Sequence, residues 1–179
     1  MKTLVVNFFA GPGAGKSTLA AGLFAELKSR GVNCELVTEY AKDKVWEESF
    51  GVFRDQLYVF AKQAHKIRRV LGKVDVVVTD SPLLLSLHYG AKEQDIFEDT
   101  WWDLVMIEHS RVPSLNVFLR RVKKYEPSGR TQTEDKAKEI DQQILDLLAG
   151  NRVPHIQMLG GLGVVPELAD KVQGMIRSG

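Results

Sequence analysis

The sequence contains a single cysteine and no hydrophobic stretch long enough to cross a membrane. Cys34 has no partner for an internal disulfide, and its apolar neighbours predict a buried, unreactive thiol, as is typical of a protein from the reducing cytoplasm. A membrane helix needs about 18 consecutive apolar residues, so we expect no membrane partner. The first residues lead directly into an apolar segment and a glycine-rich loop that signal-peptide cleavage would remove. We therefore expect a mature cytoplasmic protein.

The sequence also has little excess charge, few histidines and no internal repeat. Lysine and arginine total 24 against 23 aspartate and glutamate residues, a formal net charge of +1. A protein that neutralises many phosphates of a nucleic acid usually carries a larger basic excess, so bulk charge argues against a nucleic-acid coat or repressor but not against a local basic patch. The four histidines show no paired metal-ligand spacing. The length and the lack of a linker predict one domain over 1–179.

What the sequence does contain is an alternation of short apolar runs with longer segments of helical periodicity. The first run, 4–9, is continuous and partly β-branched, as in a strand buried on both faces. This alternation predicts an α/β fold with right-handed crossovers and a parallel sheet flanked by helices. We expect strands at 4–9, 33–38, 74–79, 115–119 and 153–159, helices at 17–29, 53–71, 100–109, 133–148 and 166–176, a leucine-rich segment at 82–89, and helix-ending glycines at Gly31 and Gly72.

Polar segments follow four of these predicted strands. They are 11–16, 39–40, 80–81 and 120–130. Ligands of parallel α/β sheets bind beyond the carboxyl ends of the strands. We therefore expect the four segments to converge on one crevice.

The first of these segments reads AGPGAGKST and matches G-x-x-x-x-G-K-[ST], apart from Ala10 in the first position. Its glycines permit backbone angles closed to other residues and let amide groups approach phosphate oxygens. The following helix directs its partial positive charge at the same oxygens, Lys16 supplies a cation for the β- and γ-phosphates, and Ser17 offers a hydroxyl to Mg²⁺. The segment predicts binding of Mg²⁺ and the triphosphate of ATP or a close relative through Gly11, Gly13, Ala14, Gly15, Lys16, Ser17 and Thr18.

Asp80 follows the apolar run 74–79 and is the second candidate. A carboxylate at this position can hold Mg²⁺ opposite Ser17, directly or through water, and in a kinase it can orient or deprotonate the attacking hydroxyl. The alternative is an N-cap for a helix that begins at Pro82, a position that Ser81 could fill instead. We favour the metal role because the phosphate loop is present.

A basic segment interrupted by proline and glycine follows the fourth predicted strand. Its position predicts a lid over about residues 120–132 that closes on the phosphates, excludes water and stabilises the charge of the transferring group. Arg121 and Arg130 are the candidates for contacting that group, and Arg120 for covering the adenine. The alternatives are a solvated cationic surface and a nucleic-acid contact with Tyr125 as a stacking platform.

The acceptor pocket is expected to begin at Glu39, where the second predicted strand ends. Glu39 could accept a hydrogen bond from a sugar hydroxyl or act as the base in place of Asp80, and it could instead only pair with Lys42 or Arg54. A glutamine on the helix 53–71 presents both a donor and an acceptor to a base or a phosphate. The candidate acceptor-binding residues are Glu39, Tyr40, Arg54 and Gln63.

Together, the phosphate loop, Glu39-Tyr40-Ala41, Asp80-Ser81-Pro82 and the segment from Arg121 to Arg130 resemble the kinase branch of P-loop NTPases. The closer likeness is to the nicotinamide-riboside-kinase-like ATPase group, which includes many small bacteriophage proteins, and it covers nearly the whole chain. The resemblance implies a P-loop kinase-type fold with a five-stranded parallel sheet, the use of ATP and Mg²⁺, and phosphoryl transfer to a nucleoside-type or nucleotide-type acceptor. The sequence shows no second domain such as a nucleotidyltransferase, so the bifunctional chemistry of some relatives is not implied.

Three functions therefore remain open. The first is a kinase for a small nucleoside or nucleoside monophosphate, the second a kinase acting on a hydroxyl within DNA or RNA, and the third an ATP-dependent switch. Compact size and near-neutral charge favour the first. The sequence fixes neither the acceptor, nor the choice of Asp80 or Glu39 as base, nor the oligomeric state, for which a homodimer is one alternative.

Overall fold

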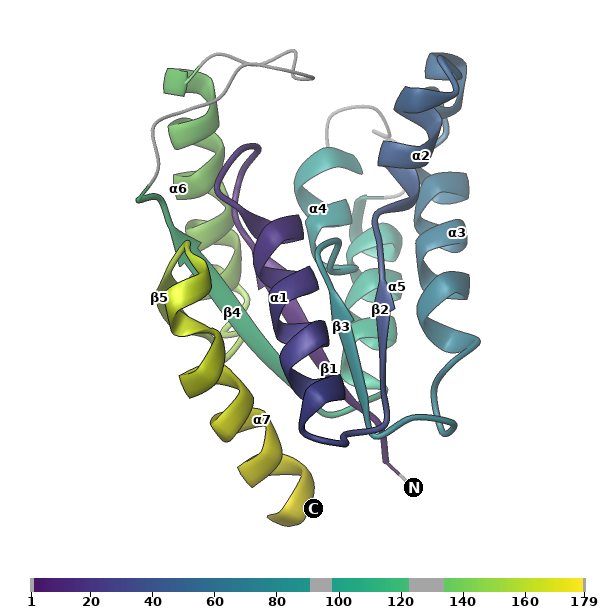
Figure 1. The fold of residues 1–179 in the computed structure, drawn as a ribbon. Helices are drawn as coiled ribbons and strands as arrows, with labels where there is room; N and C mark the ends of the chain where they lie inside the picture. The colour runs from purple at the N-terminus through teal and green to yellow at the C-terminus, as the bar shows by residue number, and fades with distance from the viewer. Residues whose placement is uncertain (1, 91–97, 123–133, 179) are drawn as a thin grey trace.

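The computed structural model describes residues 2–90, 98–122 and 134–178, and its sheet has five strands in the order β2-β3-β1-β4-β5. Every pair of neighbouring strands is parallel, so the predicted sheet is confirmed (Figure 1). The strands are β1 (Leu4–Phe9), β2 (Cys34–Val37), β3 (Val76–Thr79), β4 (Ser114–Arg120) and β5 (Ile156–Leu159).

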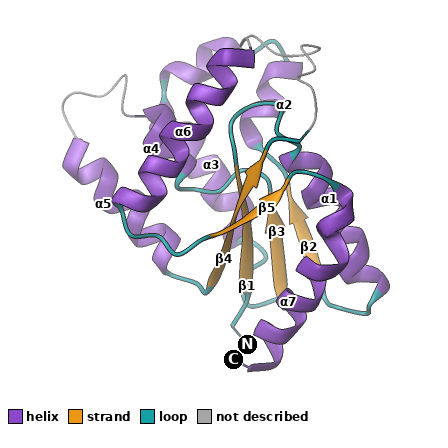
Figure 2. Ribbon diagram, turned by 90° about the vertical axis from the view of Figure 1, so that its left-hand side faces the viewer, coloured by secondary structure: helices purple, strands orange, loops and turns teal. Residues whose placement is uncertain are grey.

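Helices cover both faces of this sheet, as Figure 2 shows from the side. The helices α1 and α7 pack on one face, and α3, α4, α5 and α6 contribute to the hydrophobic cluster on the other. The helical elements are α1 (Lys16–Ser29), α2 (Tyr40–Trp46), the 3-10 helix η1 (Phe50–Arg54), α3 (Gln56–Arg68), α4 (Leu85–Gly90), α5 (Glu98–Ser110), α6 (Glu134–Gly150), the 3-10 helix η2 (Leu162–Val164) and α7 (Val165–Ser178).

The central strand β1 is buried on both faces, as predicted, although Asn7 interrupts its apolar run. The buried side chain of Asn7 donates to Oδ1 of Asn116 at 3.0 Å. Val6 and Phe8 join the cluster under α1 and α7, whereas Val5 and Phe9 join the cluster on the opposite face. Strand order reverses at β1, which has β3 on one side and β4 on the other. Ligands bind at such switch points, and here the loop that leaves β1 lies at one.

The expected helix 53–71 is shorter than predicted, and a 3-10 helix precedes it. The side chain of Asp55 accepts a hydrogen bond from the backbone N–H of Tyr58 at 2.9 Å, which is a helix N-cap. This cap starts α3 at Gln56 and separates it from η1. The α-helix ends at Arg68, and turns carry the chain through Gly72, whose φ is +75°.

Other element boundaries also differ from the expectation. Helix α2 was not predicted and buries none of its residues, so the sequence carries no apolar stripe there. The strand expected from 153 begins at Ile156, because the backbone N–H of Val153 bonds to the last turn of α6. Gly31 ends α1 as predicted, with φ +75°. No helix within the described residues is long and apolar enough to span a membrane.

Candidate functional site

The phosphate loop joins β1 to α1 at the switch point of the sheet (Figure 1). Gly13 and Gly15 have φ values of +80° and +98°, a conformation that favours glycine. Gly15 is the N-cap of α1 and has no side chain with which to cap it, so the backbone N–H groups of the first turn can bind a ligand. Ala10 is fully buried at the strand end, among core residues, which explains why alanine is accepted in the first motif position.

Gly11 differs from the other two loop glycines. Its φ is not positive, and its role is close approach, since a Cβ there would lie 2.7 Å from the carbonyl oxygen of Ala137 on α6. Its backbone N–H donates to Oδ1 of Asp141 at 2.6 Å. The expectation that Gly11 adopts a glycine-only backbone angle is therefore wrong, and its contact with ATP stays a prediction.

Lys16 lies across the loop that precedes it. Its Nζ donates to the carbonyl oxygens of Ala10 at 2.7 Å and Gly11 at 3.1 Å. Burial lowers the pKa of Lys16, and the carboxylates of Glu39 and Asp80 oppose that shift. The ammonium group and these two carboxylates therefore share one electrostatic environment, as convergence at the strand ends predicts.

Asp80, directly after β3, is 4% exposed, and its Oδ1 has no hydrogen-bond partner among the described residues. It caps no helix, because α4 begins at Leu85 rather than at Pro82, which removes the capping alternative. Ser17, in the first turn of α1, is exposed. An orphaned buried carboxylate oxygen and an accessible hydroxyl fit a Mg²⁺ ion, which takes few protein oxygens together with water and phosphate. Within the described residues no cluster of three or more His, Cys, Asp or Glu side chains could hold a metal by itself.

Glu39 is the N-cap residue of α2, but its side chain makes no capping hydrogen bond. It forms no ion pair with the described residues, so the predicted alternative of pairing with Lys42 or Arg54 is absent there. Burial raises the pKa of Glu39, Lys16 acts in the opposite direction, and Asp80 adds to the increase. Glu39 is thus a partly buried carboxylate near a cation and a second carboxylate.

Gln63 on α3 is 5% exposed and anchors the start of α2. Its Oε1 accepts the backbone N–H of Tyr40 at 2.9 Å, while its Nε2 has no partner among the described residues. The hydroxyl groups of Tyr40 and Tyr58 lie 3.4 Å apart. Arg54, the remaining acceptor candidate, is exposed at the end of η1. The structure thus joins Gln63 to Tyr40 directly, whereas Arg54 makes no such contact within the part of the chain that is described.

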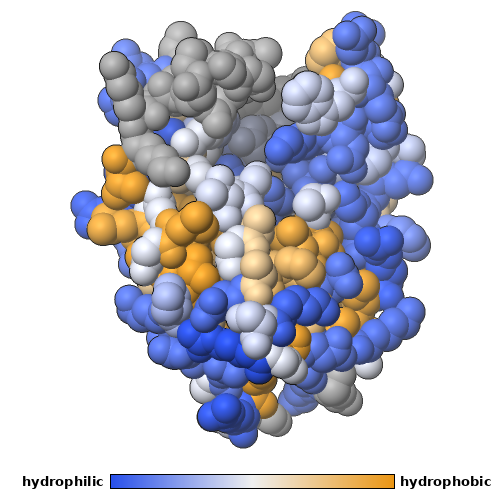
Figure 3. Space-filling model, in the orientation of Figure 1, coloured by the Kyte–Doolittle hydropathy of each residue, from blue (hydrophilic) through white to orange (hydrophobic). Residues whose placement is uncertain are grey.

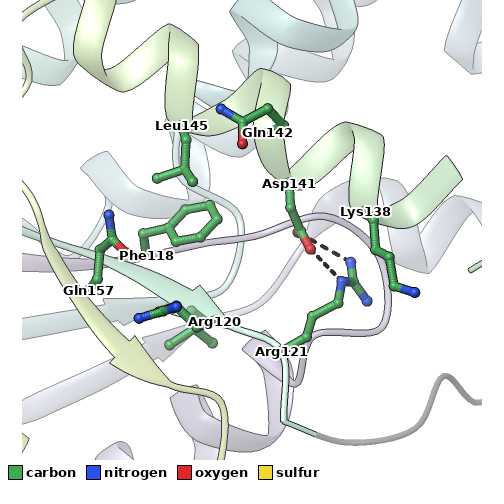
Figure 4. Close-up of a pocket in the computed structure, with 9 residues that line it drawn as sticks. Phe118, Arg120, Arg121, Lys138, Asp141, Gln142, Leu145 and Gln157 are labelled. Carbon is green, nitrogen blue, oxygen red and sulfur yellow. Dashed lines mark hydrogen bonds and ion pairs between the residues drawn. The ribbon is translucent and has the colours of Figure 1, made fainter. Parts of the chain in front are cut away.

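Arg121 follows β4 and pairs with Asp141 on α6, as Figure 4 shows. Its Nη2 also donates to the carbonyl oxygen of Ala137 at 3.1 Å. Sequence reasoning missed Asp141, because an acid on the polar face of a predicted helix carries no motif. The same carboxylate binds the N–H of Gly11, so it links the arginine to the phosphate loop.

A pocket of about 480 Å³ borders this ion pair, between β4, β5 and α6. Arg120 lies in it with Gln157 and points away from Arg121 in Figure 4.

Most of the predicted lid, including Arg130, lies outside the described residues, so the lid and the role of Arg130 stay predictions. In the space-filling view of Figure 3, the side of the molecule formed by α2 and α3 is mostly hydrophilic.

A family model described as an AAA domain matches residues 5–162 of the chain. A crystal structure of NadR protein in complex with NR is similar with a TM-score of 0.70 and 14% sequence identity, over 96% of this chain and 52% of that chain. A NadR structure in complex with NAD and AMP-PNP has a TM-score of 0.69 and 16% identity, over 96% and 49%. The chain thus spans about half the length of these structures, and the likeness shows a shared fold.

The family match covers most of the chain and includes the phosphate loop with its confirmed strand and helix. The sheet order places that loop where a P-loop protein binds its nucleotide. The chain therefore belongs to the AAA domain family and has a kinase-like P-loop NTPase fold.

Proposed function

We propose that the protein is an ATP- and Mg²⁺-dependent phosphotransferase that moves the γ-phosphoryl group of ATP to a small nucleoside-type or nucleoside monophosphate acceptor. The observation that carries this proposal is the buried carboxylate of Asp80, whose Oδ1 lacks a partner among the described residues and which acts electrostatically on Lys16. A buried carboxylate is costly unless a cation or a donor satisfies it. A magnesium-bound triphosphate on the phosphate loop would supply that cation.

The residues of the loop have distinct tasks in this reaction. The backbone N–H groups at the start of α1 and the ammonium group of Lys16 bind the phosphate oxygens. Ser17 and Asp80 would hold the Mg²⁺ ion, which neutralises phosphate charge when it is bound. Positioning and charge stabilisation account for most of the catalysis in phosphoryl transfer, and these groups would supply the part that acts on ATP.

A carboxylate beside the loop would orient the acceptor. If the acceptor group is a hydroxyl, its oxygen forms the new bond to the γ-phosphorus, ADP leaves, and the hydroxyl proton passes to Glu39 or Asp80. Burial raises the pKa of Glu39, so its ionised form is a stronger base than an exposed glutamate. Either carboxylate lies at the edge of the sheet where the acceptor would meet the γ-phosphate.

The acceptor side supports a small substrate with hydrogen-bonding groups. Gln63 is fixed by Tyr40, and its buried Nε2 offers a donor that no described residue uses. Glu39, which directly precedes Tyr40 in the chain, adds a carboxylate as a hydrogen-bond acceptor. A nucleoside or its monophosphate presents both acceptors and hydroxyl donors. The similar NadR structures contain NR in one case and NAD with AMP-PNP in the other, which agrees with this substrate class.

One surface favours the second function, a kinase acting on DNA or RNA. On α2 and α3, Trp46 is 77% exposed and Tyr58 is 40% exposed, with Nζ of Lys62 5.1 Å from the Tyr58 ring centre. Exposed aromatic rings beside lysines can stack the bases of a single strand. The acceptor assay therefore includes an oligonucleotide.

The test is to incubate the protein with γ-labelled ATP, Mg²⁺ and a panel of nucleosides, nucleoside monophosphates and 5′-hydroxyl oligonucleotides. We expect label on a nucleoside or a monophosphate, no transfer in EDTA, and none from the Asp80→Asn variant at low Mg²⁺. Label on the oligonucleotide alone would replace the proposed acceptor with a polynucleotide. Release of inorganic phosphate without any labelled acceptor would overturn the phosphotransferase in favour of an ATPase.

A further inference from the structure

Asp141 on α6 contacts two parts of the candidate site at once. Its Oδ1 accepts the backbone N–H of Gly11 at 2.6 Å, and both of its oxygens pair with the guanidinium group of Arg121 (Figure 4). The side chains of Asp141 and Arg121 are only 15% and 14% exposed. An ion pair at this burial is held in one geometry more firmly than a surface pair.

The pairing uses one edge of the guanidinium group of Arg121. Nε and Nη2 face Asp141, and Nη2 also donates to the carbonyl oxygen of Ala137. Nη1 has no partner among the described residues. A guanidinium group carries five N–H donors in a planar fork, so Arg121 can stay on Asp141 and still present the two N–H groups of Nη1 to an anion.

Close packing brings this arginine against the phosphate loop. A Cβ on Gly11 would lie 3.1 Å from Nη2 of Arg121 and 2.9 Å from Oδ1 of Asp141. Arg121 is also close enough to Lys16 to lower the pKa of the lysine, whereas Asp141 raises it. The carboxylate therefore offsets the repulsion between two cations at one phosphate site.

We propose that Asp141 is a positioning residue that holds Arg121 against the phosphate loop, with Nη1 directed to the phosphoryl group that is transferred. This inference rests on the proposed function. An arginine ordered before the reaction stabilises the charge of the transition state without a reorganisation cost at that moment. Asp141 acts through Arg121 and through the amide of Gly11, and it does not itself touch the substrate.

The test compares Asp141→Asn, Asp141→Ala, Arg121→Ala and the double variant with Asp141 and Arg121 both replaced by alanine. Asparagine keeps an acceptor oxygen for the N–H of Gly11 but removes the negative charge that pairs with Arg121. The matched control is Asp146→Ala on the same helix, an exposed aspartate that contacts Gln142 at 2.8 Å. For each variant, kcat for ATP hydrolysis and for transfer, the Kd of AMP-PNP and the Tm are measured.

We expect Asp141→Asn and Arg121→Ala to lower kcat at least about tenfold, with the Kd of AMP-PNP within about threefold of the wild type. The double variant should fall no more than about threefold below Arg121→Ala, because residues that act as a unit are not additive. The control should keep wild-type turnover and affinity.

Wild-type turnover in Asp141→Asn would overturn the inference, since a purely structural contact to Gly11 survives that change. An undiminished effect of Asp141→Ala in the Arg121→Ala background would also overturn it. If the wild type hydrolyses ATP but labels no acceptor, the phosphotransferase proposal fails and the hydrolysis rates alone decide the role of Asp141. A wild type that neither hydrolyses ATP nor transfers phosphate would overturn both.

Discussion

The ammonium group of Lys16 donates to the carbonyl oxygen of Ala10 at 2.7 Å, so the lysine folds back over the loop from which it rises. Its Nζ also donates to the carbonyl oxygen of Gly11, the first residue of the same loop. Burial opposes the charge of Lys16, and Glu39 and Asp80 favour it. The cation that a phosphate would meet is therefore fixed by the loop and balanced by two acids that also belong to the site.

Replacing Lys16 with alanine should abolish phosphoryl transfer while the fold survives. The variant loses the cation nearest the phosphates, and removal of one such group typically lowers kcat by about 100- to 1,000-fold. It also removes a charge whose burial is unfavourable, so the Tm should not fall by much. Transfer assays and circular dichroism measure the two effects. Lys171→Ala on the exposed surface of α7 is the control, and full activity of Lys16→Ala would refute the assignment of the loop.

Asp80→Asn should raise the Mg²⁺ concentration needed for half-maximal activity. Asparagine is a neutral and weaker ligand, and loss of a carboxylate that binds a metal directly or through water costs about 10- to 100-fold in affinity. Titrating Mg²⁺ at fixed ATP measures this change. Asp75→Asn, before the amino end of β3, is the matched control. An unchanged Mg²⁺ dependence in Asp80→Asn would rule out the metal role.

The pH dependence of activity should reveal whether Glu39 is the base. Because burial raises the pKa of Glu39 above the usual 4.5, the ionised form is lost at a higher pH than for an exposed glutamate. Wild-type kcat should therefore fall on the acid side as the pH drops through this raised pKa. In Glu39→Gln that acid limb should disappear along with most of the activity. A variant that keeps both the limb and its rate would assign the base to Asp80.

Glu39→Gln should also change stability with pH in a defined direction. The unfolded chain releases the Glu39 proton near pH 4.5 and the folded chain at a higher pH, so the wild type loses stability as the pH rises through that interval. Glutamine does not titrate, and the variant should therefore have the higher Tm at neutral pH. The difference should vanish below the ordinary pKa of a glutamate. Thermal melts at both ends of this range measure it.

The fold and the phosphate loop were predictable because they depend on local patterns. A short, largely apolar and partly β-branched run such as 4–9 favours a strand buried on both faces, and the loop after it has a motif with fixed spacing. The hydrophobic pattern of a sequence is less informative for a helix that buries few of its residues. Helix α2 contributes no residue to the core, so its sequence has no stripe to recognise.

The contacts of Asp141 and Gln63 could not be predicted from the sequence. Gly11 and Asp141 are 130 positions apart, and only the packing of α6 on the loop brings them together. Gln63 was a candidate from its chemistry, but its bond to the backbone of Tyr40 depends on where an unpredicted helix starts. The free donor of Gln63 and the orphaned oxygen of Asp80 likewise become visible only once burial is known.

Two substitutions of Gln63 separate its anchoring role from its free donor. Gln63→Glu keeps an oxygen for the N–H of Tyr40 and removes the amide donor, so it should raise the KM of the acceptor. Because position 63 is buried, the new carboxylate should also lower the Tm, more at neutral than at acid pH. Gln63→Met removes both functions and should also destabilise the fold by about 1 kcal/mol, the usual worth of one hydrogen bond. Acceptor titrations and thermal melts distinguish them. Equal KM values for Gln63→Glu and the wild type would exclude Nε2 from the acceptor pocket.

Gly11→Ala should destabilise the protein, although alanine is the mildest change that adds a Cβ. The new carbon would lie 2.7 Å from the backbone oxygen of Ala137, and a helix backbone cannot yield as a side chain does, so α6 must move away from the loop. Overpacking of this kind costs about 1 to 3 kcal/mol.

Gly174→Ala on α7 is the matched control, because nothing lies within 4 Å of its Cβ position. A glycine-to-alanine change inside a helix stabilises by about 0.5 to 1 kcal/mol, so the two variants should shift the Tm in opposite directions. If Gly11→Ala instead melts at or above the wild-type temperature, α6 does not pack on the phosphate loop as described, and the link between Gly11, Asp141 and Arg121 has no structural basis.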